Sequence, residues 1–233
     1  MRIAIISDVH ANLPALEAVL KKIEELQADV IHCLGDIVGY GPHPNECVEL
    51  VRKRCSIVIK GNHDSGLTGE TPIDDFNQYG QAAIRWTSKC ITPENLKYLS
   101  NLPLMKVEDD ITLVHASPVR PHEWTYVLNL HEAVESFKAF TTSHCFIGHT
   151  HLPIVVGEDL TINAFKFDIR HLINVGSVGQ PRDGNPDSAF GLLDTEKKSY
   201  ATVRAAYDVA STARAIKNAG LPSFLGKRLY RGT

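Results

Sequence analysis

The chain has 233 residues, of which 43% are hydrophobic and 22% are charged, and its formal net charge at pH 7 is −3. This length is enough for one large domain with a full hydrophobic core, and the charge excludes the strongly basic surface that is typical of nucleic-acid-binding proteins. From this charge we expect no stable nucleic-acid binding. No apolar run approaches the ~20 residues that a membrane-spanning helix requires, so we expect no membrane association either.

The first third of the chain predicts strands that alternate with helices. Residues 2–6 are a β-branched run typical of a strand buried on both faces. The run begins with Arg2, as a secretion signal can, but Ser7 and Asp8 interrupt it and no small-residue cleavage site follows. Asn12 can then cap a helix whose apolar residues recur at helical spacing.

Two more strand patterns follow, at 29–36 (DVIHCLGD) and 55–64 (CSIVIKGNHD), with a helix that starts at Pro44 between them. The third strand is expected to end in a polar turn. Strands that alternate with helices in this way predict a parallel sheet with right-handed crossover connections.

The pattern is interrupted between residues 65 and 103, where we expect a partly helical insertion with helices near 76–89 and 93–100. Strands resume at 111–118 (ITLVHASP) and 144–151 (HCFIGHTH). We predict a helix near 130–140 between these strands, then short strands and turns to about 207, a hairpin at 190–207, a final helix near 208–219 and a basic tail. The whole chain, 1–233, is therefore expected to form a single domain.

The five cysteines are scattered, odd in number and without a C-x-x-C pair, at positions 33, 47, 55, 90 and 145. A disulfide scaffold or a zinc knuckle is not expected from this arrangement. Reduced thiols in a cytoplasmic protein are the simpler interpretation.

Polar residues with metal-ligand chemistry follow five of the predicted strands. They are Asp8 and His10 in SDVH, Asp36 in LGD, Asn62 and His63 in GNHD, His115 in LVHASP, and His149 and His151 in GHTH. Because ligand sites in open parallel sheets lie beyond the carboxyl ends of the strands, these side chains are expected to meet at one edge.

Carboxylates, imidazoles and one amide suit first-row divalent ions such as manganese, iron, zinc or nickel, and are too rich in nitrogen for a dedicated calcium or magnesium site. Seven candidate ligands, with His63 set aside, are too many for one closed tetrahedral site. Two ions that share one carboxylate as a bridge could be coordinated by all seven. Two such ions against two carboxylates leave a positive surplus, which favours an anionic substrate such as a phosphate ester.

Each residue taken alone also has an ordinary structural explanation. Asp8 could bind backbone amides in a turn, and the Gly-Asp dipeptide that ends in Asp36 is a common turn sequence. His115 and His149 could be core histidines held by carbonyl groups. The His-x-His spacing is more specific, because residues two apart on an extended segment point to the same side.

The blocks SDVH, GD, GNHD, VHASP and GHTH, in this order, resemble the five signature blocks of the calcineurin-like metallophosphoesterases. The later NVGSVGQPRDGNPDSAFGLLD resembles the closing strands of the small bacterial and archaeal branch. This resemblance implies an α/β fold, a four-layer αββα sandwich of two mixed β-sheets flanked by helices.

The resemblance also implies a role for each position. Asp8, His10 and His151 are expected to hold one divalent ion, Asn62, His115 and His149 the other, and Asp36 both. His63 is expected to donate a proton to the departing oxygen or to support it electrostatically, and Asp64 could orient its imidazole. The implied reaction is attack by a metal-bridging hydroxide on phosphorus, in line with the leaving alkoxide.

One departure from the wider superfamily concerns phosphate binding. Protein phosphatases and symmetrical dinucleoside-polyphosphate hydrolases carry G-D-x-x-x-R-G, whereas this chain has GDIVGYGPHP, with Gly39 and Tyr40 where the pattern has an acid and its arginine. Another cation would have to bind the phosphate. Candidate substrate contacts are Asn12, Arg120 and Arg182, and Tyr40, His43, Trp86 and His122 are candidates for contact with a leaving group.

These features favour hydrolysis of phosphodiesters or other small-molecule or nucleotide phosphate esters. Phosphomonoesterase or protein-phosphatase-like activity is the alternative within the same class. A non-catalytic metal-binding scaffold resembling the retromer subunit is a different class, which retention of all seven ligands and His63 disfavours. A slow regulatory sensor and homo-oligomer formation both stay open.

Overall fold

The computed structural model describes residues 1–233 and contains two five-stranded mixed sheets. The first sheet has the order β10–β9–β1–β2–β3, in which β1, β2 and β3 are parallel and β9 runs antiparallel to both β1 and β10. Its strands are β1 (Arg2–Ile6), β2 (Val30–Cys33), β3 (Ile57–Val58), β9 (Ser188–Asp194) and β10 (Ser199–Ala205).

The second sheet has the order β4–β5–β6–β8–β7. Strands β5, β6 and β8 are parallel, and the edge strands β4 and β7 are antiparallel to their neighbours. The strands are β4 (Met105–Glu108), β5 (Ile111–Val114), β6 (His144–Ile147), β7 (Ile154–Gly157) and β8 (His171–Asn174).

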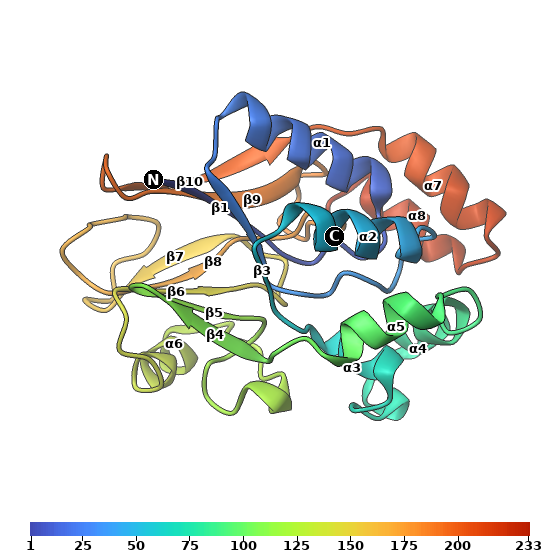
Figure 1. Ribbon diagram of the computed structural model, residues 1–233, viewed down its shortest axis with the longest axis horizontal. Coiled ribbons are helices and arrows are strands. Elements are labelled where there is room, and N and C mark those ends of the chain that lie inside the picture. The colour runs from blue at the N-terminus through green and yellow to red at the C-terminus, as the bar shows by residue number, and fades with distance from the viewer.

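Helices cover the outer faces of the two sheets, which gives the predicted four-layer sandwich (Figure 1). Helices α1 and α2 lie over the first sheet and α6 lies against the second. The helices are α1 (Leu13–Glu25), α2 (Pro44–Arg54), α3 (Asn62–Thr68), α4 (Gln78–Thr87), α5 (Pro93–Ser100), α6 (Leu130–Phe137), α7 (Val209–Asn218) and α8 (Ser223–Leu229), with 3₁₀ turns η1 (Ile73–Asp75) and η2 (Pro121–Glu123).

A continuous apolar layer fills the space between the sheets. Ile5 and Ile59 from the first sheet's side pack with Leu113, Phe146 and Ile173 from the second, and all five are fully buried. Burial of this kind is the main favourable contribution to folding. The shared core supports the expectation that the chain forms one domain.

Most predicted elements are confirmed, including the helices near 76–89, 93–100 and 130–140 and the hairpin at 190–207. Three expectations need correction. The third strand is only Ile57–Val58, and the GNHD block starts helix α3 instead of a turn. Strand β4 was not predicted, because its four residues are all exposed at a sheet edge. The basic tail contains helix α8, whose Leu225 and Leu229 are buried.

None of the helices is both long and apolar enough to cross a membrane. All five cysteines are free thiols, and Cys33, Cys47 and Cys145 among them are buried.

Candidate metal centre

The seven candidate ligands lie together at the carboxyl-terminal ends of the parallel strands of both sheets. Six of them are at most 5% exposed and Asn62 is half-buried. Three come from loops after β1 and β2, one from the start of α3, and three from loops after β5 and β6. The convergence follows from topology, because parallel strands end at the same edge of a sheet.

One group of ligand atoms consists of Asp8, His10 and His151. His151 Nε2 lies 3.2 Å from Asp8 Oδ1, and His10 Nε2 lies 3.7 Å from the same oxygen. The two Nε2 atoms are 3.1 Å apart. All three side chains therefore direct one donor atom toward a common point.

Asp36 belongs both to a group with His10 and His63 and to a second group with His115 and His149. Its Oδ2 lies 3.6 Å from His10 Nε2 and 3.5 Å from His115 Nε2. His115 Nε2 is also 3.2 Å from Asn62 Oδ1. One carboxylate oxygen thus lies between two clusters of donors, as a bridging ligand would.

In three of the four candidate histidine ligands, a hydrogen bond to a carbonyl oxygen fixes which ring nitrogen carries the proton. His10 Nδ1 donates to Val38 O at 3.2 Å, and His115 Nδ1 donates to Leu34 O at 2.8 Å. His151 Nδ1 donates to Gln180 O at 2.5 Å. A carbonyl only accepts, so in the neutral rings Nε2 is the unprotonated lone-pair atom. Histidine ligands of metals are commonly oriented by such bonds.

This assignment leaves electron-pair donors that face one another in a buried space. His10 Nε2 faces His151 Nε2, and Asp8 Oδ1 and His149 Nε2 have no hydrogen-bond partner at all. Buried polar atoms normally have partners, and facing lone pairs repel unless a proton or cation lies between them. The residues therefore fit divalent cations.

Each carboxylate is anchored through its second oxygen to a backbone amide. His149 N donates to Asp8 Oδ2 at 3.0 Å, and His63 N donates to Asp36 Oδ1 at 2.8 Å. These bonds join loops that are distant in the chain and leave Asp8 Oδ1 and Asp36 Oδ2 for the cluster. The geometry of the candidate ligands is thus set before any ion binds.

Two glycines permit this close approach of the loops. A Cβ on Gly61 would lie 2.2 Å from Asp36 Oδ1, and one on Gly148 would lie 2.0 Å from Ser7 Oγ. No larger residue fits at either position. The glycines that precede Asn62 and His149 are therefore structural requirements of the two motifs.

Backbone strain is concentrated at the same place. Positive φ angles occur at five of the seven candidate ligands, namely Asp8, His10, Asp36, His149 and His151. Left-handed backbone costs a non-glycine residue about 1–2 kcal/mol, and strain of this kind tends to persist at functional sites. The fold therefore stabilises these positions against their local preference.

The charges at the site are strongly coupled. Burial alone would raise the pKa of Asp8 and Asp36, but nearby histidines (His151 at Asp8, His115 at Asp36) hold both below their usual range. Burial alone would lower the pKa of His115, but Asp36 raises it to about 9. Burial and the neighbouring His115 lower the pKa of His149 to about 3. A proton on His115 therefore balances part of the carboxylate charge, whereas His149 stays neutral.

His63 lies at the edge of the cluster, with its ring centroid 5.0 Å from that of His10 and 4.5 Å from that of Tyr40. The hypothesis that Asp64 orients it is wrong. Asp64 accepts hydrogen bonds from the backbone amides of Ile37, Val38 and Gly61, while His63 Nδ1 has no partner. Asp64 instead ties the second signature block to the third.

The three candidate substrate contacts lie in different surroundings. Asn12 is buried and caps α1, and its amide bonds to Gly179 O and Thr212 Oγ1, so its polar atoms serve the fold. Arg120 is exposed and pairs with Glu123 at 2.7 Å. Arg182 alone lies beside the cluster, because its backbone N donates to His151 O and its guanidinium donates to Gln180 Oε1.

A cleft of about 310 Å³ opens onto the cluster and is lined by Asn62, His63 and His149 at its floor. The sequence indicated Tyr40 as a contact, and it does line the cleft. Trp86 instead packs near the C-terminal helices and donates to Ala219 O, and neither His43 nor His122 lines the cleft. Three aromatic residues that sequence reasoning missed form its walls: Phe76, Trp124 and Tyr126.

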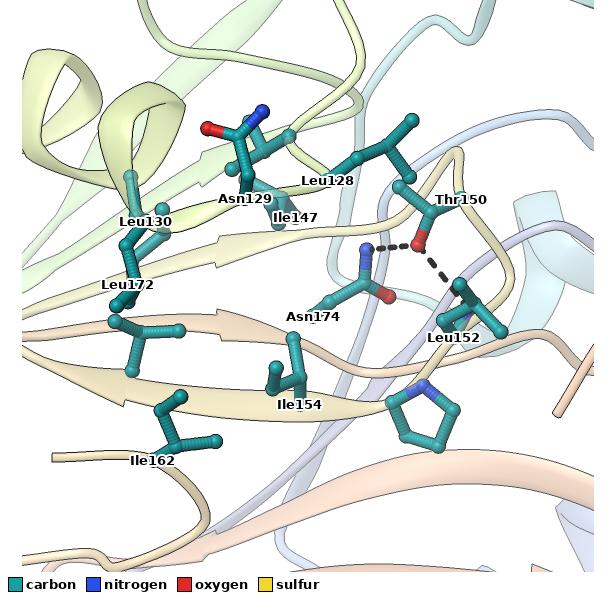
Figure 2. A pocket seen from close by; sticks show the side chains of 14 residues that line it. Leu128, Asn129, Leu130, Ile147, Thr150, Leu152, Ile154, Ile162, Leu172 and Asn174 are labelled. Carbon is teal, nitrogen blue, oxygen red and sulfur yellow. Dashed lines mark hydrogen bonds between the residues drawn. The ribbon is translucent and has the colours of Figure 1, made fainter.

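The loop that carries His149 and His151 is supported from behind. Asn174 Nδ2 donates to Gly148 O at 2.5 Å and to Thr150 Oγ1 at 2.9 Å, and Thr150 Oγ1 accepts from Leu152 N. Figure 2 shows the two bonds to Thr150 Oγ1 at one end of an apolar groove of about 230 Å³ beside β6, β7 and β8. Thr150 lines this groove, and none of the candidate ligands does.

The fold and the donor set are those of a metallophosphoesterase. Residues 1–198 match the model of the calcineurin-like phosphoesterase superfamily domain, and the chain belongs to that family. It is 42% identical to an uncharacterized protein of Methanocaldococcus jannaschii, over 99% of this chain and 98% of that protein.

Two other relatives extend the comparison. The crystal structure of a metallophosphoesterase from Sphaerobacter thermophilus is 42% identical and superimposes with a TM-score of 0.90, over 100% of this chain and 99% of that one. The phosphodiesterase YfcE of Escherichia coli is 25% identical over 84% of this chain and 89% of its own length.

Proposed function

We propose that the protein is a phosphodiesterase that depends on two divalent metal ions, with Asp8, His10, Asp36 and His151 around one ion and Asp36, Asn62, His115 and His149 around the other. The observation that carries the proposal is the set of buried donor atoms on both sides of Asp36 Oδ2, among which the Nε2 atoms of His10 and His151 face each other. Manganese, iron, zinc or nickel suits this set. Bound there, two such ions would lower the pKa of water and neutralise charge on the phosphate oxygens.

The chain's own residues would position the ester and assist its cleavage. His63 lies between the cluster and the cleft, so its imidazole can hydrogen-bond the departing oxygen and favour its protonation. The buried histidines and carboxylates are held by backbone groups and need not move as charge develops. Arg182 is the nearest candidate for a direct contact with a phosphate oxygen.

A diester substrate is favoured over a monoester or a phosphoprotein. Position 40 holds Tyr instead of the arginine of the protein phosphatases, and none of the eleven cleft-lining residues is Lys or Arg. A monoester carries one more negative charge at neutral pH than a diester, so its binding would gain more from a Lys or Arg side chain in the cleft. The similarity to a bacterial phosphodiesterase agrees with this choice.

The alternative functions have less support. A non-catalytic scaffold would not require the strained, fully retained donor set together with His63. A cytoplasmic location is proposed from the free buried thiols.

The proposal is tested by hydrolysis of bis(4-nitrophenyl) phosphate and 4-nitrophenyl phosphate after removal of metals and addition of Mn²⁺. Turnover of the diester that is abolished by chelation and exceeds turnover of the monoester is the expected result. Turnover of neither ester by folded, metal-loaded protein would favour a scaffold, and preference for the monoester would favour a phosphomonoesterase.

A further inference from the structure

The cleft over the candidate metal centre is built from two loops that sequence patterns did not connect. One wall carries Phe76, at the end of η1 in the 65–103 insertion, and the other carries Trp124, directly after η2. Trp124 Nε1 donates to Thr71 Oγ1 at 2.9 Å, which links the two walls. The cleft is therefore formed by both loops together, and this bond joins them.

Aromatic rings line the cleft next to the residues that would act on the ester. The ring centroid of Phe76 is 5.1 Å from that of His63, and the ring of Tyr126 stacks on His149 with centroids 4.0 Å apart. Trp124 approaches His115 edge-on at 6.0 Å. A group attached to the departing oxygen beside His63 would thus lie along Phe76 and between the aromatic walls.

The charge of the cleft complements a leaving group without further phosphates. Asp75 and Glu123 lie at its rim, Glu123 is already paired with Arg120, and no Lys or Arg lines the cleft. A polyphosphate chain in the cleft would meet the carboxylates of Asp75 and Glu123, and the cation that lies beside them, Arg120, is already paired with Glu123. A flat, uncharged ring would instead find aromatic faces and the side-chain amide of Asn77.

We infer that this cleft binds the leaving group of the substrate and selects phosphodiesters of a single phosphate whose leaving alcohol carries a flat, uncharged aromatic ring, such as a nucleoside. The inference rests on the proposed phosphodiesterase function and on the position of His63 beside the leaving oxygen. A volume of about 310 Å³ is at the lower end of the ~300–1,000 Å³ of small-molecule sites. It suits one ring system with its sugar.

A pair of substrates with the same leaving oxygen isolates the contribution of the ring. Thymidine 5′-(methyl phosphate) and its analogue without the base, 1,2-dideoxyribose 5′-(methyl phosphate), both leave through a primary alcohol. We expect kcat/KM for the thymidine diester to be roughly ten- to a hundred-fold higher, the range that aromatic stacking on one base supplies. A symmetrical dinucleoside tetraphosphate should be cleaved more slowly than the thymidine diester.

Variants of the walls test the assignment of the cleft. Phe76→Leu and Trp124→Leu should each reduce the preference for the thymidine diester over the base-free analogue, measured as the ratio of the two kcat/KM values, at least several-fold. Phe167→Leu, a matched change in an aromatic residue that does not line the cleft, should leave the preference unchanged. In a Trp86→Phe background, where Trp124 is the remaining tryptophan, added thymidine should quench the fluorescence.

The outcomes separate this inference from the proposed function. Cleavage of both diesters at equal rates, a preference that survives both wall variants, unquenched Trp124 fluorescence, or faster cleavage of the tetraphosphate would overturn the inference and leave a phosphodiesterase. Cleavage of neither diester, while thymidine still quenches Trp124, would instead contradict the proposed function.

Discussion

His10 and His151 point their Nε2 atoms at each other across 3.1 Å, although the carbonyl bonds at Nδ1 make both atoms acceptors. Facing acceptors with no proton between them repel, so this contact is unfavourable in the ion-free neutral form. A bound cation removes the repulsion and gains two ligands. The stability of the protein is therefore expected to depend on divalent ions.

Removal of metals should lower the thermal midpoint of unfolding, and Mn²⁺ or Zn²⁺ should restore it. An ion present at about 100 times its dissociation constant stabilises the folded state by about 2.7 kcal/mol, which is several degrees for a chain of this size. Differential scanning fluorimetry measures the shift. Ca²⁺ is the control, because a nitrogen-rich site binds it poorly. An identical midpoint with chelator and with millimolar Mn²⁺ would contradict the assignment.

Replacement of His63 by Asn should separate catalysis from metal binding. His63 has no assigned role as a ligand, so the variant should keep the metal content of the wild type while kcat falls by about 10²–10⁴-fold, the usual contribution of an acid or base group. Elemental analysis and diester turnover provide the two readouts. His122→Asn, at an exposed position outside the cleft, is the control. Loss of metal from His63→Asn would place His63 among the ligands instead.

Replacement of Asn174 by Ala should weaken metal binding although Asn174 lies behind the loop and is not a candidate ligand. The change removes the bonds from Asn174 Nδ2 to Gly148 O and Thr150 Oγ1, which then keep only Thr150 N and Leu152 N as donors, at a cost of about 0.5–1.5 kcal/mol for each lost bond. It also frees His149 and His151 to leave their strained backbone conformations. The metal affinity is measured by calorimetry and the free energy of unfolding by urea titration.

Asn129→Ala is the matched control for this change. Asn129 lines the same groove but caps α6, so its loss should cost about 1 kcal/mol of stability without a change in metal affinity. Equal metal affinities in the two variants would mean that Asn174 acts only on stability.

Acid should destabilise the protein in part through His144, which is buried among Phe146, Phe165 and Phe167. Burial lowers its pKa from 6.5 to about 4. Between these values the unfolded chain binds a proton that the folded chain does not, so this contribution to stability is full above pH 6.5 and is lost as the pH falls toward 4. His144→Phe should flatten the decline of the unfolding free energy in this window. A decline as steep as that of the wild type would exclude the role.

The convergence of the candidate metal ligands was predictable from the sequence, and the cleft was not. Asp8, Asp36 and His149 follow apolar runs, and parallel strands bring such positions to one edge whatever the loops do. Phe76 and Trp124 lie in irregular segments without periodicity. The loops that carry them are joined by a side-chain bond from Trp124 to Thr71, which no local pattern indicates.

Residues near a motif were also harder to interpret than those within it. Asp64 follows His63 directly, but its carboxylate turns to backbone amides of the neighbouring loop. Arg120 and Arg182 both lie in proline-containing loops, and only the structure distinguishes the solvated arginine from the one beside His151. Such distinctions depend on side-chain direction, which composition and spacing do not encode.

The most direct measurement is the number of divalent ions bound per chain, determined by elemental analysis after equilibration with Mn²⁺ and removal of excess ion, for the wild type and for Asp36→Asn. We predict two ions for the wild type and at most one for the variant, because Asp36 Oδ2 lies within reach of both groups of donors. Asp74→Asn, at an exposed position, should retain two. One ion or none in the wild type, or two ions retained without the Asp36 carboxylate, would contradict a shared bridge.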